Sequence, residues 1–258
     1  MGELYALVSA GGSPGVTTAA IALALTWPSP VIVAECDPSG GDVLAGLLTG
    51  HVPGNQGLME HAIEAGRDGP AAARALGAQL IPLDVDSTRT LLPGLTDPRQ
   101  AAALASAWPA VTATLSAQDA DVIADCGRLD AGSGQPLAVM AAARTIAIVL
   151  RPTLRQVWSA RPRVEILAQY VDARSALSLL VTGQGTHPPR EVSRALGVPV
   201  VAVLPHDAPS AALLSDGVGS WHNLVSGALL RSAWAAGRAL RGYEAATTEQ
   251  TSAARSVG

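Results

Sequence analysis

The chain of 258 residues contains no lysine and no phenylalanine, and all 17 of its basic residues are arginines. The missing lysines exclude one kind of phosphate contact, because neither this chain nor a second copy of it can supply a lysine ammonium group. Any positive charge that meets an anionic ligand must therefore come from arginine or a metal ion, with backbone N–H groups as further donors.

Cysteine is scarce, and long apolar runs are absent. The two cysteines, Cys36 and Cys126, indicate no disulfide framework and fit a reducing compartment. No apolar run approaches the roughly 18 residues that a membrane-spanning helix needs. The residues after Met1 do not form a signal-peptide pattern. The sequence therefore predicts a cytoplasmic protein.

Charged residues make up only 15% of the chain, whereas hydrophobic residues make up 48%, which excludes a wholly disordered chain. The net charge of −4 argues against binding nucleic acid over the whole surface. The charge is uneven, however, because residues 144–194 hold 8 arginines and only 3 acidic residues. This segment either meets an acidic partner, such as DNA or a lipid headgroup, or forms solvated helix faces.

Short apolar runs rich in valine and isoleucine recur along the chain, and they are continuous rather than alternating, as in strands covered on both faces. They lie at 4–10, 30–35, 78–83, 121–126, 144–150, 176–183 and 199–205. Helical segments such as 17–27 and 98–117 separate them, which predicts an α/β fold: a mostly parallel sheet with helices on both faces, in three layers. We expect one domain over 1–243 and a disordered tail over 244–258.

A glycine-rich stretch, VSAGGSPGVTTAAIALAL, joins the first predicted strand to a helix at 8–25. On the phosphate-binding pattern G-x-x-x-x-G-K-[ST], Val16 takes the place of the lysine and Thr17 that of the magnesium-binding hydroxyl. Such a loop binds phosphate mainly through backbone N–H groups at a helix N-terminus. Because the lysine also stabilises charge in phosphoryl transfer, its loss is expected to reduce hydrolysis more than binding.

Carboxylates follow two of the other apolar runs. Residues 34–48 carry Glu35, Asp37 and Asp42, and Asp125 ends the run at 121–126. Because the carboxyl ends of parallel strands share one edge of the sheet, we expect these acids beside the glycine-rich loop. There an acid can hold a magnesium-bound water. For Asp125, a cap of the strand end is an equally good interpretation.

Taken in order, these motifs resemble the ParA/MinD family of P-loop ATPases over roughly residues 4–220, and most closely its CpaE/TadZ branch. The family loop reads K-G-G-x-G-K-T-T, and its two lysines fall on Gly11 and Val16 here, so the Walker A motif is degenerate. CDPSGGDVLAGLL resembles that branch's D-x-x-x-G-D-x-x-x-x-L segment, with Asp37 and Asp42 on the two acids. LGVPVVAVLPHDAPSAALLSDG, at 196–217, resembles the family's late strand and I-P-x-D turn.

The resemblance implies a site for ATP and Mg²⁺, in which Thr17, Asp37 and Asp125 are the expected metal ligands and Asp37 the expected catalytic residue. Pro205 and Asp207 are expected near the adenine, whereas Thr182 lies where members often carry a base-reading asparagine. The expected nucleotide-binding residues are Gly11, Gly12, Ser13, Gly15, Val16, Thr17, Thr18, Arg128, Arg151, Thr182, Pro205 and Asp207.

Several side chains near these motifs have more than one interpretation. Arg128 and Arg151 each follow a predicted strand and either replace the missing lysines or form surface ion pairs. Cys126 is interpreted as a small buried hydrophobe rather than a reactive thiol. His206 is interpreted as the variable residue of its turn.

The segment 228–240 is amphipathic: Leu229, Ala233, Ala236 and Leu240 share one face, and Arg231, Trp234 and Arg238 share another. Because the apolar face is small and rich in alanine, we expect it to pack on the sheet rather than to insert into a membrane. Any recruitment to the membrane or to a cell pole is then peripheral.

The CpaE/TadZ resemblance implies a localisation or scaffold factor for a Tad-type pilus or secretion machine. Such a protein is expected to form a homodimer and to bind ATP and Mg²⁺ weakly if at all, with slow or absent hydrolysis. Two alternatives remain. One is a DNA-partitioning ATPase that binds DNA through the arginine-rich segment 144–194. The other is a pseudo-ATPase that binds no nucleotide and acts only as an interaction module.

Overall fold

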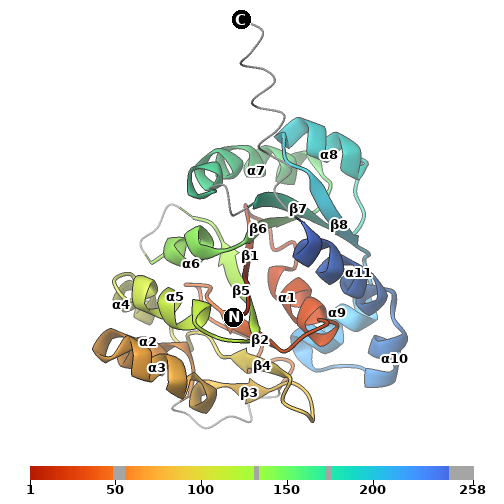
Figure 1. The fold of residues 1–258 in the computed structure, drawn as a ribbon. Helices are drawn as coiled ribbons and strands as arrows, with labels where there is room; N and C mark the ends of the chain where they lie inside the picture. The colour runs from red at the N-terminus through yellow and green to blue at the C-terminus, as the bar shows by residue number, and fades with distance from the viewer. Residues whose placement is uncertain (49–55, 131–133, 172–175, 244–258) are drawn as a thin grey trace, which may run out of the picture.

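The computed structural model describes residues 1–48, 56–130, 134–171 and 176–243, and the expected tail at 244–258 lies outside them (Figure 1). An eight-stranded sheet runs through the described chain in the order β3-β4-β2-β5-β1-β6-β7-β8. The strand pairs are parallel except β3 and β4, which are antiparallel. The predicted α/β fold is therefore confirmed.

The strands are short, and most follow the predicted runs. Their bounds are β1 Leu4–Ser9, β2 Val31–Glu35, β3 Ile81–Pro82, β4 Arg89–Leu92, β5 Asp121–Arg128, β6 Thr145–Leu150, β7 Ala176–Thr182 and β8 Val200–Leu204. The α-helices are α1 Val16–Leu25, α2 Leu58–Arg67, α3 Gly69–Ala75, α4 Ala101–Leu104, α5 Trp108–Ser116, α6 Leu137–Ala142, α7 Leu154–Leu167, α8 Pro189–Leu196, α9 Ala208–Asp216, α10 Trp221–Ser226 and α11 Ala228–Gly242. Short 3₁₀ helices lie at Leu76–Gln79, Pro98–Gln100 and Ala168–Tyr170.

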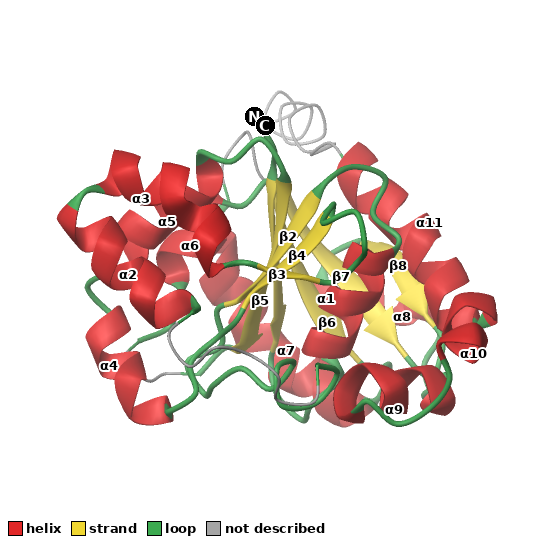
Figure 2. Cartoon of the chain, turned by 90° about the horizontal axis from the view of Figure 1, so that it is seen from below, coloured by secondary structure: helices red, strands yellow, loops and turns green. Residues whose placement is uncertain are grey.

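Each face of the sheet has its own apolar core. Successive residues of a strand point to opposite faces, so Ala6 and Val8 of β1 join the cluster that packs against α2, α5 and α6. Tyr5 and Leu7 join the cluster formed with α1, α9 and α11. Figure 2 shows α2, α3, α5 and α6 on one side of the sheet and α1, α9, α10 and α11 on the other. This is the predicted three-layer arrangement.

Two predicted elements differ from the structure. The run at 78–83 contributes only the two-residue β3. The strand that pairs with β2 on the side away from β5 is β4, which the sequence analysis missed. β4 has four residues and begins with Arg89, so its apolar signal is too short to detect. The predicted helix at 98–117 is divided into a 3₁₀ turn, α4 and α5. Pro109 lies in the first turn of α5, where its missing N–H breaks no helical hydrogen bond.

The helix α11 packs as its sequence predicts. Leu229, Ala233, Ala236 and Leu240 are buried, whereas Trp234 is 52% exposed and lies under Arg238, with 5.0 Å between the guanidinium carbon and the ring centroid. In the described part of the chain, no helix combines the length and the apolar character that crossing a bilayer requires. The apolar face of α11 is therefore part of the core.

Asp121, at the start of β5, joins distant parts of the chain. Its carboxylate accepts hydrogen bonds from the Glu3 backbone N–H at 2.9 Å, the Trp27 indole N–H at 2.8 Å and the Ser29 hydroxyl at 2.9 Å. It also forms an ion pair with the Arg241 guanidinium at 3.3 Å. Since Arg241 lies in the last turn of α11, one buried carboxylate holds both ends of the fold to the sheet.

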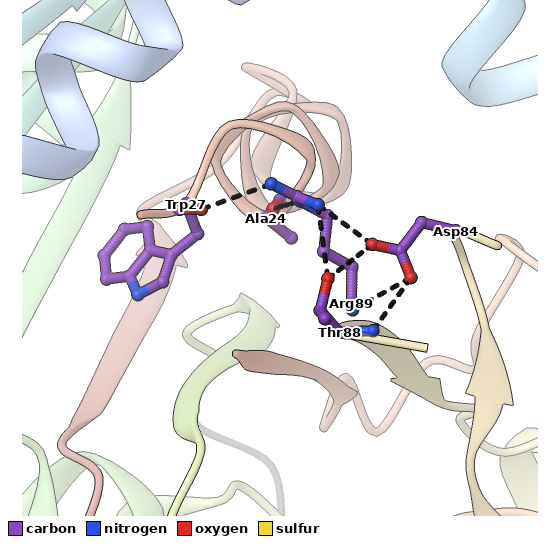
Figure 3. A network of polar contacts seen from close by, with 5 residues as sticks. All are labelled: Ala24, Trp27, Asp84, Thr88 and Arg89. Atoms are coloured by element: carbon purple, nitrogen blue, oxygen red, sulfur yellow. Dashed lines mark hydrogen bonds and ion pairs between the residues drawn. The ribbon is translucent and has the colours of Figure 1, made fainter. Parts of the chain in front are cut away.

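The C-terminal end of α1 is held by an arginine from β4 (Figure 3). Arg89 Nε donates to the Ala24 carbonyl at 3.0 Å and Nη2 donates to the Trp27 carbonyl at 3.4 Å. Asp84 accepts from Arg89 Nη1 at 2.9 Å. Burial acts to raise the pKa of Asp84, but hydrogen bonds from Thr88 and Arg89 outweigh it and lower this pKa to about 2. The last carbonyls of a helix lack helical partners, so a cation there fixes α1 in place.

Candidate functional site

The glycine-rich loop between β1 and α1 has the backbone of an anion cradle. Gly12, Ser13 and Gly15 have φ angles of 73°, 43° and 96°, which are left-handed conformations. Gly15 is the N-cap of α1, and no side chain caps the helix there. The N–H groups of the first turn therefore lack an internal partner, and the helix dipole favours a negative charge in front of them.

A cavity of about 600 Å³ opens in front of this helix terminus. That size is typical of small-molecule sites. It extends along the carboxyl edge of the sheet from the glycine-rich loop to the end of β8. The expected residues that line it are Gly12, Ser13, Gly15, Val16, Thr17, Thr18, Asp37, Arg128, Arg151, Thr182, Pro205 and Asp207. Gly11 and Asp125 are not among its lining residues.

Asp125 lies behind the cavity rather than in its wall. It is 3% exposed and accepts the Gly127 backbone N–H at 3.0 Å, and the nearby Thr17 side chain acts to lower its pKa. Burial raises the pKa of Asp125 to about 6. The contact with the Gly127 N–H is that of a strand-end cap, whereas the expected role of Asp125 as a metal ligand stays a prediction, because Asp125 does not line the cavity. The neighbouring Cys126 is fully buried, and burial raises the pKa of its thiol well above the ordinary value, as expected for a structural cysteine.

Asp37 reaches the cavity by passing close to Gly127. A Cβ atom on Gly127 would overlap the Asp37 carboxylate, and the φ angle of Gly127 is 60°. Only glycine fits both conditions. Asp37 Oδ1 accepts the Ser39 backbone N–H at 2.7 Å, which leaves Oδ2 without a hydrogen bond to any described residue. Asp37 therefore offers a carboxylate oxygen beside the glycine-rich loop.

Glu35, which the sequence grouped with the site acids, is a structural residue. Its Oε1 accepts the backbone N–H groups of Asp42 at 3.0 Å and Val43 at 3.2 Å. Its Oε2 accepts the Gly94 N–H at 3.1 Å. Burial raises the pKa of Glu35 to about 7 although these hydrogen bonds oppose the shift. This side chain fixes the segment that carries Asp37 into the cavity.

Arg128 and Arg151 bring positive charge to the cavity from the ends of β5 and β6. Arg128 Nε forms an ion pair with Asp130 at 3.0 Å, and its side chain is 55% exposed, so it both lines the cavity and makes a surface pair. Arg151 has no acidic partner within 4.0 Å among the described residues. Of the two arginines, Arg151 is therefore the one whose positive charge is not already paired with a carboxylate.

Two residues expected at the base end have structural contacts. The Thr182 hydroxyl donates a hydrogen bond to the Pro14 carbonyl at 2.8 Å, which joins the glycine-rich loop to β7. Asp207 accepts the Ser210 N–H at the start of α9 and the Leu229 N–H at the start of α11, each at 3.2 Å. Burial acts to raise the pKa of Asp207, but these hydrogen bonds outweigh it and lower the pKa.

Gln156 is a site residue that sequence reasoning missed. It is 5% exposed, and its Oε1 accepts the Arg151 backbone N–H at 2.8 Å. A Cβ atom on Gly12 would lie 3.3 Å from Gln156 Nε2, so this amide also lies against the phosphate loop. A single glutamine in a helix belongs to no motif, so the sequence carries no signal that could have found it.

The oxygen donors at the phosphate end suit a hard cation. In the described ranges, no group of three or more His, Cys, Asp or Glu side chains is arranged to hold a metal by itself. The Thr17 hydroxyl and the carboxylates of Asp37 and Asp42 do line the cavity. Mg²⁺ takes few protein ligands and completes its shell with water and phosphate oxygens. These residues fit Mg²⁺ that arrives with a phosphate ligand.

The sheet topology and the glycine-rich loop define a P-loop NTPase-like α/β protein. Among solved structures, the chain is similar to a ParA family ATPase from Chlorobium tepidum TLS, with a TM-score of 0.72 and 16% identity over 91% of this chain and 97% of that one. It is also similar to the septum site-determining protein MinD from Pyrococcus horikoshii OT3, complexed with Mg-ADP. The TM-score is 0.70 and the identity is 18%, over 95% of this chain and 100% of that one. For an ATP complex of a Cyanothece McdA variant, the TM-score is 0.67 and the identity is 16%, over 96% of this chain and 99% of that one.

No protein-family model matches the chain, and no curated protein matches it in sequence. Identities of 16% to 18% establish a shared fold and leave the site to be argued from its own residues. The chain therefore has the fold of the ParA and MinD ATPases.

Proposed function

We propose that the chain is a ParA/MinD-family protein of the CpaE/TadZ branch that acts as a localisation or scaffold factor for a Tad-type pilus or secretion machine. In this proposal residues 1–243 are the ParA/MinD-like unit, and nucleotide controls its homodimerisation. Recruitment to the membrane or a cell pole is peripheral and depends on partner proteins. The observation that carries the proposal is the intact backbone cradle of α1 in a chain that has no lysine.

The residues around the cavity support weak binding of ATP and Mg²⁺. The backbone N–H groups of the α1 N-terminus would bind phosphate, with Thr17 and Asp37 holding the metal and Asp125 orienting Thr17. Arg151 and Arg128 would supply the positive charge that lysine normally gives. When bound, Mg²⁺ neutralises phosphate charge. The Mg-ADP and ATP in the Pyrococcus and Cyanothece structures support a nucleotide as the ligand.

The same residues support slow or absent hydrolysis. Val16 is 7% exposed and belongs to the apolar cluster around α1, so its side chain can offer no charge to a transition state. Phosphoryl transfer depends mostly on such charge stabilisation. Asp37 can orient a water molecule beside the phosphates, but orientation without a nearby cation lowers the barrier only in part.

Calorimetry with ATP and Mg²⁺ tests the proposal. We expect heat of binding with a dissociation constant in the millimolar to micromolar range. Arg151→Ala should weaken the affinity for ATP about tenfold or more. Val16→Lys should tighten ATP binding or raise turnover, whereas Val16→Met, which adds length without charge, should do neither. If millimolar ATP gives neither heat nor a thermal shift, the nucleotide-controlled scaffold is wrong and the nucleotide-free interaction module is favoured.

The DNA-partitioning alternative is favoured by the exposed arginines of the segment 144–194. Arg155, Arg190 and Arg194 are exposed there. Others are already engaged, since Arg144 pairs with Glu3 at 3.4 Å and Arg161 donates to the Ala195 carbonyl at 3.2 Å. A gel shift at two salt concentrations separates the functions, because binding through these arginines must weaken steeply with salt. No shift at low salt eliminates this alternative.

A further inference from the structure

A second hollow adjoins the nucleotide cavity on the carboxyl edge of the sheet. It measures about 260 Å³ and is lined by Arg151, Gly183, Gln184 and His206. Three of these residues, Arg151, Gly183 and His206, also line the larger cavity. The two hollows therefore share a wall, and a ligand in the larger one lies beside the smaller one.

The walls of this hollow carry hydrogen-bond donors and positive charge but no carboxylate. Arg151 contributes a guanidinium group, Gln184 a side-chain amide and His206 an imidazole. Within the described ranges none of these three groups hydrogen-bonds or ion-pairs with another side chain or backbone atom. A guanidinium beside two further donors is the arrangement that binds phosphate through charge-assisted hydrogen bonds. The hollow is thus suited to an anion.

Arg151 is held at this position from behind. The buried Gln156 accepts its backbone N–H at 2.8 Å, and Pro152 next to it is buried. The backbone at the end of β6 is therefore fixed, and Arg151 lines both hollows. Fixing the backbone reduces the ordering that anion binding demands of this arginine.

The strand order indicates which part of a nucleotide passes the hollow. The phosphate loop follows β1, and Pro205 and Asp207 follow β8, with β6 and β7 between them. A nucleotide with phosphates on the loop and its base toward β8 must cross the ends of β6 and β7. Arg151 and Gly183 lie at those two ends. The sugar joins phosphate to base, so the sugar lies nearest to the hollow.

We propose that this hollow binds a phosphate group carried on the sugar of the nucleotide. The preferred ligand is then a nucleotide with a 2′- or 3′-phosphate in addition to its 5′-phosphates. This inference rests on the proposed function, because it takes the larger cavity to be a nucleotide site. In this proposal Arg151 and His206 contact the additional phosphate, and Gln184, which lines only the smaller hollow, donates to it.

Calorimetry of the full chain with Mg²⁺ tests this inference. The ligands are ADP and the two adenosine 5′-diphosphates that carry a 2′-phosphate or a 3′-phosphate. We expect one phosphorylated isomer to bind about tenfold or more tightly than ADP, as an added charge-assisted contact implies. Gln184→Ala and His206→Ala should bring this ratio toward one, whereas His222→Ala, an exposed histidine on α10, should leave it unchanged.

The outcomes separate the two proposals. If neither ADP nor its phosphorylated forms bind to the wild-type chain, the proposed nucleotide site itself is wrong. If ADP binds but both phosphorylated isomers bind no more tightly, the nucleotide site stands and the anion subsite is wrong. The subsite is also wrong if the tighter binding survives in both Gln184→Ala and His206→Ala.

Discussion

Opposing forces act on single carboxyl groups at the carboxyl edge of the sheet. Three backbone N–H groups favour the charged form of Glu35, but burial outweighs them and raises its pKa from 4.5 to about 7. Burial likewise raises the pKa of Asp125 from 3.8 to about 6. The two residues are directly opposite in the pairing of β2 with β5, and the Asp125 charge adds to the rise in the pKa of Glu35, whereas the charges of Asp37 and Asp42 add to that of Asp125.

These shifts make the folded chain less stable as the pH rises. Both carboxyls hold protons more tightly when folded than when unfolded, so the free energy of unfolding falls between about pH 4 and pH 7. Denaturant unfolding at pH 5 and pH 8 measures this fall. Glu35→Gln should reduce this fall in the free energy of unfolding. The variant should be less stable at both pH values, because the amide NH₂ group of the new side chain and the Gly94 N–H are both donors. An unchanged fall in the variant would contradict the assignment to Glu35.

Gly127 is the residue whose substitution should disturb the site most directly. In Gly127→Ala the new methyl group overlaps the Asp37 carboxylate, and the backbone has a φ angle of 60°. We expect the free energy of unfolding to fall by about 1–3 kcal/mol. Urea unfolding measures the loss, and Gly77→Ala is the matched control because nothing lies within 4 Å of its added Cβ. Equal effects of the two substitutions would refute the close contact.

At the scale of the element, most strands could be predicted from the sequence, because each of the seven continuous apolar runs overlaps one strand. β4 could not, since half of its four residues are polar and its partner β2 lies far away in the chain. The predicted helix at 98–117 failed for another reason. Its alanine-rich sequence favours helix throughout, but Pro109 has no N–H to donate to the carbonyl four residues earlier, so the helix is interrupted between α4 and α5.

The contact between β4 and α1 shows what a short element can stabilise. Arg89→Ala removes the side-chain donor to the Ala24 and Trp27 carbonyls, although Ala24 keeps the Trp27 backbone N–H, and leaves Asp84 without its ion pair. We expect the free energy of unfolding to fall by about 1–3 kcal/mol. Arg99→Ala is the control, because that side chain is 91% exposed and should matter by less than about 0.5 kcal/mol. Thermal or denaturant unfolding of both variants measures these losses. Similar losses in the two variants would argue against stabilisation of the C-terminal end of α1 by Arg89.

At the scale of the whole molecule, the candidate site collects residues from the ends of six strands, β1, β2, β5, β6, β7 and β8. The sequence could place Thr17, Asp37 and Arg151 on one edge, because the carboxyl ends of parallel strands meet there. It could not reveal that the Thr182 hydroxyl is bonded to the phosphate loop or that Gln156 supports Arg151. Those contacts depend on side-chain directions across the sheet, which no local pattern encodes.

Asp121 links the two ends of the chain, and its neutralisation should loosen α11. Asp121→Asn removes the charge that pairs with Arg241 and one of the oxygens that accept from Trp27 and Glu3. We expect a loss of about 1–3 kcal/mol in the free energy of unfolding, with faster amide exchange in α11 than in α5. Hydrogen exchange followed by mass spectrometry measures both helices. Uniform acceleration would show that Asp121 stabilises the core without linking α11 to it.

The bond from Thr182 to the Pro14 carbonyl, at 2.8 Å, has a consequence for affinity. A loop tied to β7 on one side and lying against Gln156 on the other has already lost much of its conformational entropy before any ligand arrives. An anion bound there would then order little further backbone. Such preorganisation would offset part of the attraction that a lysine at position 16 would give.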